Sequence, residues 1–223
     1  MSSGGDNQGL VCGDFTADEH TVGMKVEVLN GVKTPPGAVV IASSSEISAA
    51  IKRLAQSIAP WILTSPESPV VVVALLEGGR FFADRLVERL KMVGVLDISR
   101  VDLKVSTRND VGAPLPKPSI KGDVTALSGK RVLVVDDILD SGITIRLVRG
   151  ELSELVSELR VAVLLKKDDP VAHGPSDNRP AVDYVGISFV DSRWFSGVGL
   201  DMPNDPQGLA RQAPLLIAYP PLV

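Results

Sequence analysis

The residues best suited to chemistry are two neighbouring carboxylates, Asp136 and Asp137, and the run Asp140–Thr144 (DSGIT) that follows them. The β-branched run before Asp136 predicts a strand. Side chains alternate along a strand, so one core face cannot absorb both carboxylates. Two carboxylates at a strand end suit a magnesium ion or the vicinal hydroxyls of a sugar. In the run that follows, hydroxyls and the exposed backbone N–H groups of a helix N-terminus form an anion site, which Gly142 lets a ligand approach closely. Together these features indicate a ribose phosphate.

Two predicted strands and their turns must position these groups. The first, Val70–Leu76, is an apolar run typical of a strand buried on both faces, and Gly78-Gly79 and a helix over Phe81–Val93 follow it. The second, Arg131–Val135, leads into the carboxylates, and apolar spacing predicts a helix over Thr144–Leu159 after them. Further predicted elements are a helix over Ser44–Ala59, with Ser43 and Glu46 as a capping box, and strands over Val101–Val105, Val161–Leu165, Asp183–Val190 and Leu215–Tyr219.

This alternation of strands and helices predicts an α/β protein with a mostly parallel sheet flanked by helices on both faces. Ligands of such sheets bind beyond the carboxyl ends of the strands, where the Glu77-Gly78-Gly79 turn and Asp136–Thr144 both lie. The segment Thr107–Gly122 contains three prolines, two glycines and no periodicity. It therefore predicts a long loop, either functional or disordered.

Composition excludes several classes of protein. The chain has 223 residues, of which 44% are hydrophobic and 22% charged, which is enough apolar surface for one folded domain. Its single cysteine, Cys12, excludes an intramolecular disulfide and a multi-cysteine zinc site. The longest uncharged apolar run, Val70–Leu76, is too short to span a membrane, and we find no secretory signal. A net charge of −4 gives no reason to expect nucleic-acid binding. We expect a soluble cytoplasmic protein with a disordered tail over residues 1–9 and a single domain over residues 10–223.

The run Val132–Thr144 (VLVVDDILDSGIT) resembles the phosphoribosyl-pyrophosphate (PRPP) signature of the type I phosphoribosyltransferases. Three more segments resemble hypoxanthine-guanine phosphoribosyltransferases, in the order of that family. Val70–Leu90 is similar to their pyrophosphate-loop region, Val161–Pro170 to the segment with the purine-contacting lysine, and Asp183–Asp201 to the purine-binding segment. The resemblance implies the type I phosphoribosyltransferase fold. Its core would cover about residues 44–190, and a small hood subdomain would come from the N-terminal segment and about residues 191–223.

The resemblance also implies site residues. Asp140 would be the catalytic residue, facing N7 of the purine as general base in the forward direction and general acid in reverse. The PRPP-binding residues would be Asp136, Asp137, Asp140, Ser141, Gly142, Ile143 and Thr144. The pyrophosphate-binding residues would be Leu76, Glu77, Gly78, Gly79 and Arg211, and the first peptide of this loop is often cis in the family. The purine-binding residues would be Lys167, Trp194, Phe195 and Asp201, and the metal-binding residues Asp136, Asp137 and Asp201.

Each purine-binding residue has its own implied role. Lys167 would donate to the 6-oxo group, Trp194 would stack on the base, and the backbone of Phe195 would read the base edge. The implied reaction transfers the 5-phosphoribosyl group of PRPP to a 6-oxopurine (hypoxanthine, guanine or xanthine) with Mg²⁺ as cofactor, in purine salvage. The implied partners are PRPP and a purine base or nucleotide, in a homodimer or homotetramer, without nucleic acid or membrane.

Three positions depart from the family pattern. Glu77 stands where many members carry lysine, although Arg80 follows three residues later. Ile143 replaces a frequent lysine of the phosphate loop. The lid loop of the family carries Ser-Tyr, and its nearest equivalent here is Ser106-Thr107.

Other functions remain open from the residues. The segment Lys130–Asp137 also suits a phospho-accepting receiver domain with Asp191 as acceptor, but too few residues follow for further strand–helix units. A second alternative is a regulator that kept the PRPP fold and binds a ligand or RNA with weak or no purine activity. A third is a phosphoribosyltransferase for a pyrimidine or another base. A P-loop kinase is excluded because no Gly-Lys-Ser/Thr triplet occurs.

Overall fold

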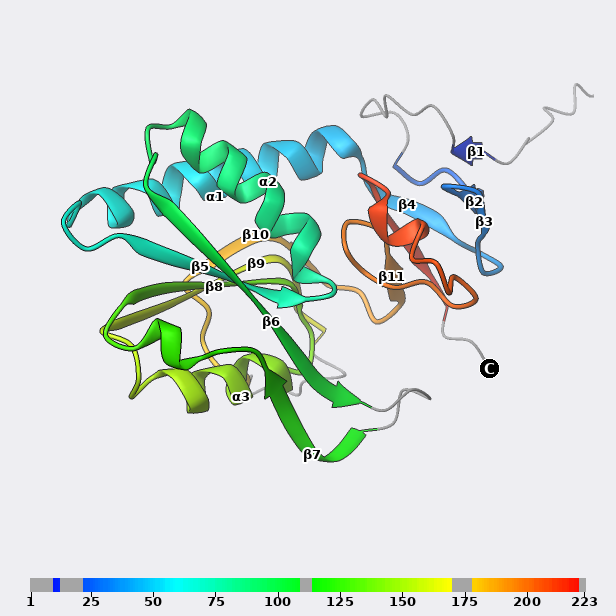
Figure 1. Cartoon of the computed structure of the whole chain (residues 1–223). Coiled ribbons are helices and arrows are strands. Elements are labelled where there is room, and N and C mark those ends of the chain that lie inside the picture. Colours follow the sequence, from blue (N-terminus) through cyan, green and yellow to red (C-terminus); the bar gives the residue numbers. More distant parts are fainter. Residues whose placement is uncertain (1–9, 13–21, 109–113, 170–177, 221–223) are drawn as a thin grey trace, which may run out of the picture. The chain divides into compact units, whose positions relative to one another are not determined.

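The computed structural model describes residues 10–12, 22–108, 114–169 and 178–220 (Figure 1). The chain forms two compact units, one from Ala49–Ser192 and one from the two ends, Met1–Ser48 and Arg193–Val223. The tail predicted for residues 1–9 lies outside the described residues. In the part of the chain that is described, no helix is both long and apolar enough to cross a membrane.

The larger unit is built on a six-stranded sheet in the order β10-β9-β8-β5-β6-β7. Its strands are β5 (Val70–Leu76), β6 (Ile98–Arg108), β7 (Pro114–Lys121), β8 (Arg131–Leu139), β9 (Glu158–Lys167) and β10 (Tyr184–Phe189). All neighbours are parallel except β6 and β7. Helices α1 (Ser44–Leu63) and α2 (Gly79–Met92) cover one face, and α3 (Ile143–Leu152) covers the other, as Figure 1 shows. The predicted mostly parallel sheet with helices on both faces is confirmed.

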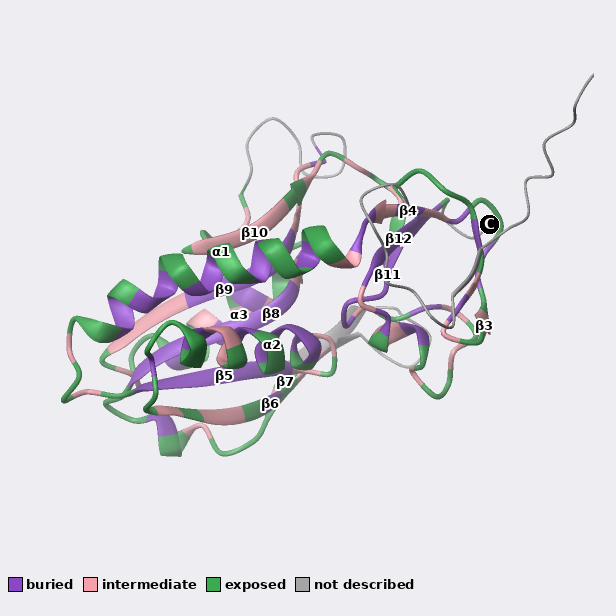
Figure 2. Ribbon diagram, turned by 90° about the horizontal axis from the view of Figure 1, so that it is seen from above, coloured by how far each residue is buried: buried purple, intermediate pink, exposed green. Residues whose placement is uncertain are grey.

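Hydrophobic burial fixes the centre of this sheet. Strands β5 and β8 lie side by side in register from Val70 opposite Arg131 to Ala74 opposite Val135, and nearly all of their residues are buried. Helix α1, in contrast, has one buried and one exposed side, so buried and exposed residues alternate along it in Figure 2. The predicted capping box at its start is confirmed, because the Ser43 backbone N–H donates to Glu46 Oε2 at 2.8 Å and the Glu46 N–H donates to Ser43 Oγ at 3.3 Å.

The loop predicted over Thr107–Gly122 is wrong for most of its length. Strand β6 runs on to Arg108, and Pro114–Lys121 forms β7, which pairs with β6 in the antiparallel sense. The prolines at 114, 116 and 118 lie in the stretch from Pro114 to Ser119, where the pairing with β6 shifts register. A strand at the edge of a sheet needs donors on only one side and therefore tolerates them.

The helix predicted to reach Leu159 ends at Leu152, because backbone groups outside the helix compete for the next residues. The Leu155 carbonyl accepts from the Gly129 N–H at 2.9 Å, and the Ser157 N–H donates to the Lys130 carbonyl at 2.9 Å. The chain then enters β9 at Glu158. Apolar spacing alone could not separate the end of the helix from the start of this strand.

The amino ends of the strands are held by a second set of contacts. The buried Arg131 guanidinium donates to the Trp61 carbonyl at 2.7 Å and pairs with Glu158 at 3.1 Å. The Trp61 ring lies beneath Arg131 and Arg160, at 4.8 and 4.7 Å from its centroid, and its N–H donates to Glu158 at 2.7 Å. Trp61 is thus a packing residue at the end of α1.

The smaller unit has its own core. One sheet has the order β1-β2-β3 and the other β11-β12-β4. The strands are β1 (Leu10–Cys12), β2 (Val26–Leu29), β3 (Val32–Lys33), β4 (Val39–Ala42), β11 (Trp194–Ser196) and β12 (Leu216–Tyr219). The core of the unit includes Leu29, Val40, Leu215, Ile217 and Tyr219, all nearly inaccessible to solvent. The described residues also form two short 3₁₀ helices, η2 (Thr125–Leu127) in the larger unit and η3 (Ala210–Gln212) in the smaller one.

Candidate active site

The candidate site lies where the strand order of the larger sheet reverses. From β5 the chain moves outward through α2 to β6, whereas from β8 it moves the opposite way through α3 to β9. The reversal therefore falls between β5 and β8, the two central strands. Ligands of open α/β sheets bind beyond the carboxyl ends of the strands at such a point. The Glu77-Gly78-Gly79 turn and the Asp136–Thr144 segment meet there, as the sequence predicted.

Two glycines make this meeting possible. A Cβ atom on Gly78 would overlap the Asp137 carboxylate, and one on Gly79 would lie 2.8 Å from the Val135 carbonyl oxygen. Only a chain without side chains at both positions can bring the turn onto the end of β8. The Leu76–Glu77 peptide is cis, as the resemblance implies, and Glu77 points into solvent.

Asp136 and Asp137 are buried at the end of β8, which extends four residues beyond its predicted end at Val135 and carries both acids inside the strand. Burial raises the pKa of Asp136 well above its ordinary value, and the charge of Asp137 raises it further, whereas a hydrogen bond from the Asp137 N–H opposes both effects. A buried carboxylate pair of this kind suits a divalent cation. Magnesium is commonly bound by one or two carboxylates together with substrate phosphates and water. Among the described residues, no three or more acidic, histidine or cysteine side chains lie close enough together to hold a metal ion by themselves.

The N-terminus of α3 follows these acids. Gly142 has φ +76° and turns the chain into the helix, whose first hydrogen bond runs from the Arg146 N–H to the Gly142 carbonyl at 2.9 Å. Within the described part of the chain, no side-chain hydrogen bond caps this end. Asp140, Ser141 and Ile143 are exposed beside it. The first turn of α3 therefore presents N–H groups that can bind a phosphate.

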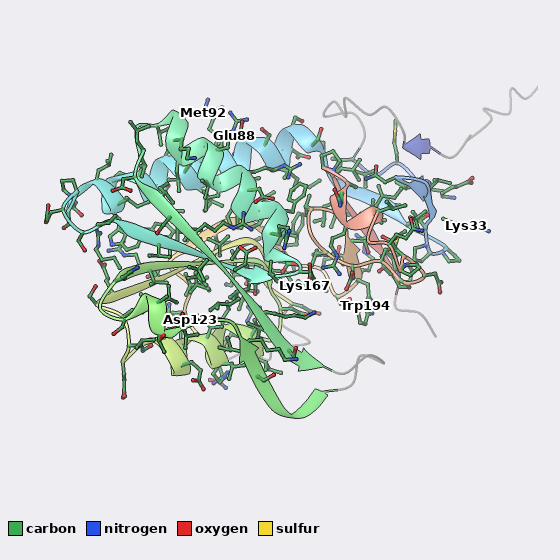
Figure 3. All side chains as sticks on the ribbon, in the orientation of Figure 1. Lys33, Glu88, Met92, Asp123, Lys167 and Trp194 are labelled. Carbon is green, nitrogen blue, oxygen red and sulfur yellow. The ribbon has the colours of Figure 1, made fainter. Side chains whose placement is uncertain are left out.

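Lys167 is the last residue of the neighbouring strand β9 and is labelled in Figure 3. Adjacent strand residues face opposite sides of the sheet, so Lys166 and Lys167 serve different environments. Lys166 Nζ pairs with Asp168 Oδ1 at 2.7 Å and is the main cause of the lowered pKa of Asp168. Lys166 is thus engaged in an ion pair at the end of β9.

Strands β6 and β7 place two lysines next to the Leu76–Gly79 turn. Lys104 is in register with Leu76 on one side and with Lys121 on the other, and both lysines are exposed. Directly opposite residues share one face of a sheet, so the two ammonium groups are neighbours. Arg80, suggested by the sequence as a substitute cation, instead lies 3.6 Å from Asp102. The lysine pair was not predicted from the sequence, because the prolines suggested a loop where β7 places Lys121 opposite Lys104.

The lid residues Ser106 and Thr107 lie within β6, two and three residues beyond Lys104. Ser106 is opposite Ser119 of β7. Residues 109–113 lie outside the described residues.

The remaining predicted site residues belong to the smaller unit. Trp194, labelled in Figure 3, stands on β11 opposite Tyr219 with 58% of its surface exposed, so its ring is available for stacking. Phe195 is buried, and its backbone forms part of the same strand. An exposed indole beside a buried phenylalanine is consistent with stacking by the first and backbone contacts by the second.

A tight turn brings Asp201 and Arg211 together. Gly197, Val198 and Gly199 all have positive φ, and the N–H of Gly199 donates to the Arg211 carbonyl at 2.8 Å. The side chains of Arg211 and Asp201 form an ion pair. The resemblance assigned Arg211 to pyrophosphate and Asp201 to the purine and to metal, and it did not predict that the two residues pair.

Comparisons with known proteins agree with this geometry. Residues 43–201 match the family model described as phosphoribosyl transferase domain. The bifunctional protein PyrR of Akkermansia muciniphila is 33% identical over 116 residues, which cover 51% of this chain and 63% of that protein, so less than two thirds of that relative is matched. The hypoxanthine phosphoribosyltransferase of Haemophilus influenzae is 27% identical over 168 residues, covering 73% of this chain and 86% of that protein.

The structure of the Trypanosoma cruzi hypoxanthine phosphoribosyltransferase in complex with the product IMP is similar to this one, with a TM-score of 0.67. It shares 22% sequence identity, over 82% of this chain and 94% of that chain. The fold is therefore the type I phosphoribosyltransferase fold. Since the family model spans most of the sequence, the chain belongs to the phosphoribosyltransferase family.

The Gly78 contact gives a test of the close approach between the turn and β8. Gly78→Ala forces a methyl group onto the Asp137 carboxylate, and such overpacking costs about 1–3 kcal/mol. We expect the free energy of unfolding, measured with urea, to fall by that amount. The matched control is Gly150→Ala, at a helical position with no atom within 4 Å, which should stabilise the protein by about 0.5–1 kcal/mol. Equal effects of the two substitutions would contradict the close approach.

The raised pKa of Asp136 predicts a pH-dependent cost. Between the ordinary aspartate pKa of about 4 and the raised folded value, the unfolded chain ionises first, so stability falls as pH rises. Without ligand, Asp136→Asn should therefore raise the Tm at pH 8 and have less effect near pH 4. Asp123 has a lowered pKa, mainly from the Thr125 hydroxyl, so Asp123→Asn should lower the Tm at pH 8. A Tm of Asp136→Asn below wild type at pH 8 would show that the carboxylate is not strained by burial.

Proposed function

We propose that this protein transfers the 5-phosphoribosyl group of PRPP to a 6-oxopurine and releases pyrophosphate. One observation carries the proposal: at the sheet reversal, a glycine turn meets two buried carboxylates that lead directly into an open helix N-terminus. Lys167 ends the next strand. The similarity to the Haemophilus influenzae hypoxanthine phosphoribosyltransferase supports a 6-oxopurine as the acceptor.

The ribose phosphate would bind across the ends of β8 and α3. The Ser141 and Thr144 hydroxyls and the N–H groups of the first turn of α3 would hold the 5′-phosphate. Asp136 and Asp137 would accept hydrogen bonds from the ribose hydroxyls and hold Mg²⁺. The bound ion would neutralise the departing pyrophosphate. Asp201, three-quarters exposed in its side chain, would hold a second ion after releasing Arg211.

In the transfer, the bond between C1′ and pyrophosphate breaks and a bond from N9 of the purine to C1′ forms. The purine must lose a proton as N9 becomes bonded. Asp140, exposed at the mouth of β8, would accept that proton at N7 and return it in the reverse reaction. Lys167 would donate to the 6-oxo group, and Trp194 would stack on the ring. A 6-amino group cannot accept the lysine hydrogen bond, so adenine should be a poor substrate.

The two lysines of β6 and β7 would supply the positive charge of the lysine that many family members carry at the position of Glu77. Like charges directly opposite each other destabilise a sheet, so Lys104 and Lys121 cost stability in the absence of an anion. A pyrophosphate bound to the Leu76–Gly79 turn would neutralise them. Arg211 would add a further cation from the smaller unit.

A second candidate is a regulatory or other-base homologue with weak or no purine activity. Two relatives named bifunctional protein PyrR are 33% and 35% identical to this chain, whereas the Haemophilus influenzae hypoxanthine phosphoribosyltransferase is 27% identical. This higher identity to proteins whose name does not specify a purine favours the second candidate. Glu77 and the missing lid tyrosine also favour it. Lys167 and the exposed Trp194 favour the oxopurine enzyme. For either candidate we propose a cytoplasmic homodimer or homotetramer.

A direct assay separates the two candidates. Purified protein with PRPP and Mg²⁺ is given hypoxanthine, guanine, xanthine, adenine or uracil, and nucleotide formation is followed by chromatography. We expect turnover with at least one 6-oxopurine and little with adenine or uracil. Turnover with uracil alone, or a lack of turnover with all five bases, would reject the proposed substrate class.

Loss of the proposed base gives the next test. Asp140→Asn should lower kcat by about 10²-fold, the usual scale for a lost general base, and should change the Kd of PRPP, measured by calorimetry, far less, because the backbone of the PRPP-binding loop remains. Asn keeps the size of the side chain and removes its ability to accept a proton. Ordinary turnover in this variant would remove Asp140 from the chemistry.

Purine recognition is tested separately. Lys167→Ala should raise the KM for the purine far more than the KM for PRPP, because only the purine loses a hydrogen-bond donor. Lys166→Ala is the matched control, since its ammonium pairs with Asp168 on the other face of β9. Equal effects on both KM values, or a larger effect of the control, would refute base recognition by Lys167.

A further inference from the structure

Arg179 is a buried arginine that the sequence did not single out. Only 5% of its side chain is exposed, and it lies just before β10. Burying a guanidinium is costly unless its donors find acceptors. The acceptors of this side chain therefore show what its burial achieves.

The guanidinium connects the ends of two neighbouring strands. Arg179 Nη1 donates to the Leu139 carbonyl at 3.3 Å and the Asp140 carbonyl at 3.0 Å, where β8 ends. The same nitrogen donates to the Lys167 carbonyl at 2.6 Å, where β9 ends. Nη2 reaches Asp168 Oδ1 at 3.3 Å. One rigid, planar group thus binds the backbone of both Asp140 and Lys167.

The stem of Arg179 also packs against the phosphate loop. A Cβ atom on Gly142 would lie 3.2 Å from Cβ and Cγ of Arg179 and 2.7 Å from Cδ of Pro180. Gly142 is the residue that turns the chain into α3. The stem of Arg179 therefore packs closely against the loop at Gly142.

The segment Asn178–Asp183 is itself held along α3. Arg146 Nη2 donates to the Asn178 carbonyl at 3.1 Å, and Arg149 Nη2 donates to the Ala181 carbonyl at 2.9 Å. Asp183 accepts from Arg149 at 3.1 Å and from the Val161 N–H at 2.8 Å. These contacts fix the backbone from which Arg179 projects, so its guanidinium has a defined position.

We propose that Arg179 is a positioning residue that sets the spacing between Asp140, the proposed proton acceptor, and Lys167, the proposed purine donor. The inference rests on the proposed function. Both residues must contact one purine ring, but they come from different strands. The pairing of β8 with β9 ends at Leu139 and Lys166, so it does not reach Asp140 or Lys167. A misplacement of about 1 Å in such a site can cost about 10²-fold in rate. Arg179 binds backbone carbonyls and acts through the two residues that contact the base.

The test compares Arg179→Gln with Arg146→Ala. Arg146 makes one of the four contacts that hold the segment and reaches neither strand end. The other three, from Arg149 and the Val161 N–H, keep Arg179 in place, so Arg146→Ala should leave kcat near wild type. Arg179→Gln should lower kcat/KM for the purine by about 10–10²-fold. The Kd of PRPP, measured by calorimetry, should change little because Asp136, Asp137 and α3 remain. Arg179→Lys keeps the charge without the fork and should recover only part of the loss.

Chemical rescue distinguishes positioning from a general loss of structure. Millimolar guanidinium should restore part of the activity of Arg179→Ala and none of that of Asp140→Asn. Wild-type kinetics in Arg179→Gln would overturn the proposal. So would an equal loss of PRPP binding and purine turnover without rescue, which a purely structural residue would produce.

Hydrogen exchange separates this inference from the proposed function. In Arg179→Gln, amides 139–144 and 166–169 should exchange faster than in wild type, whereas Arg146→Ala should leave them protected. Unchanged exchange would overturn the proposed role of Arg179 even if the enzyme is active. An inert wild-type protein would reject the proposed function, and the exchange result would still decide whether Arg179 joins the two strand ends.

Discussion

The structure depends on one close contact, between the glycine turn after β5 and the carboxylates that end β8. Gly78 and Gly79 lie against Asp137 and Val135 at distances that exclude any side chain. The contact occurs where the sheet order reverses, so both turns open toward the same side of the sheet. Everything proposed for the chemistry follows from it, because a ligand at this point touches the end of β5, the end of β8 and the N-terminus of α3 at once.

The two ends of the central strands differ in how their buried charges are stabilised. At the amino ends, the Arg131 guanidinium finds backbone carbonyls, Glu158 and the Trp61 ring, so a buried charge is satisfied. At the carboxyl ends, burial and a like charge raise the pKa of Asp136 above its ordinary range. The second arrangement costs stability in the free protein. It suits a site that is completed by a cation and a sugar phosphate, since a bound ligand stabilises the folded state.

Much of the fold could be predicted because the hydrophobic pattern was unambiguous where burial was complete. The runs Val70–Leu76 and Arg131–Val135 became the central strands, and the capping box of Ser43 and Glu46 formed as expected. The errors arose where local signals conflict with tertiary pairing. Prolines suggested a loop where an edge strand tolerates them. Apolar spacing extended the predicted α3 over Leu155 and Ser157, whose backbone groups instead form hydrogen bonds with Gly129 and Lys130 before β8.

The sequence by itself determined the chemical groups of the site and their order, because residue types at fixed spacing along one strand and one turn need no distant partner to be recognised. It thereby indicated the carboxylates, the phosphate loop and the mostly parallel sheet. Only the tertiary structure decided which distant residues meet: Lys104 with Lys121, Asp201 with Arg211, and Arg179 with both Asp140 and Lys167. Strand register and the burial of a side chain depend on how the whole chain packs, and no local pattern encodes them.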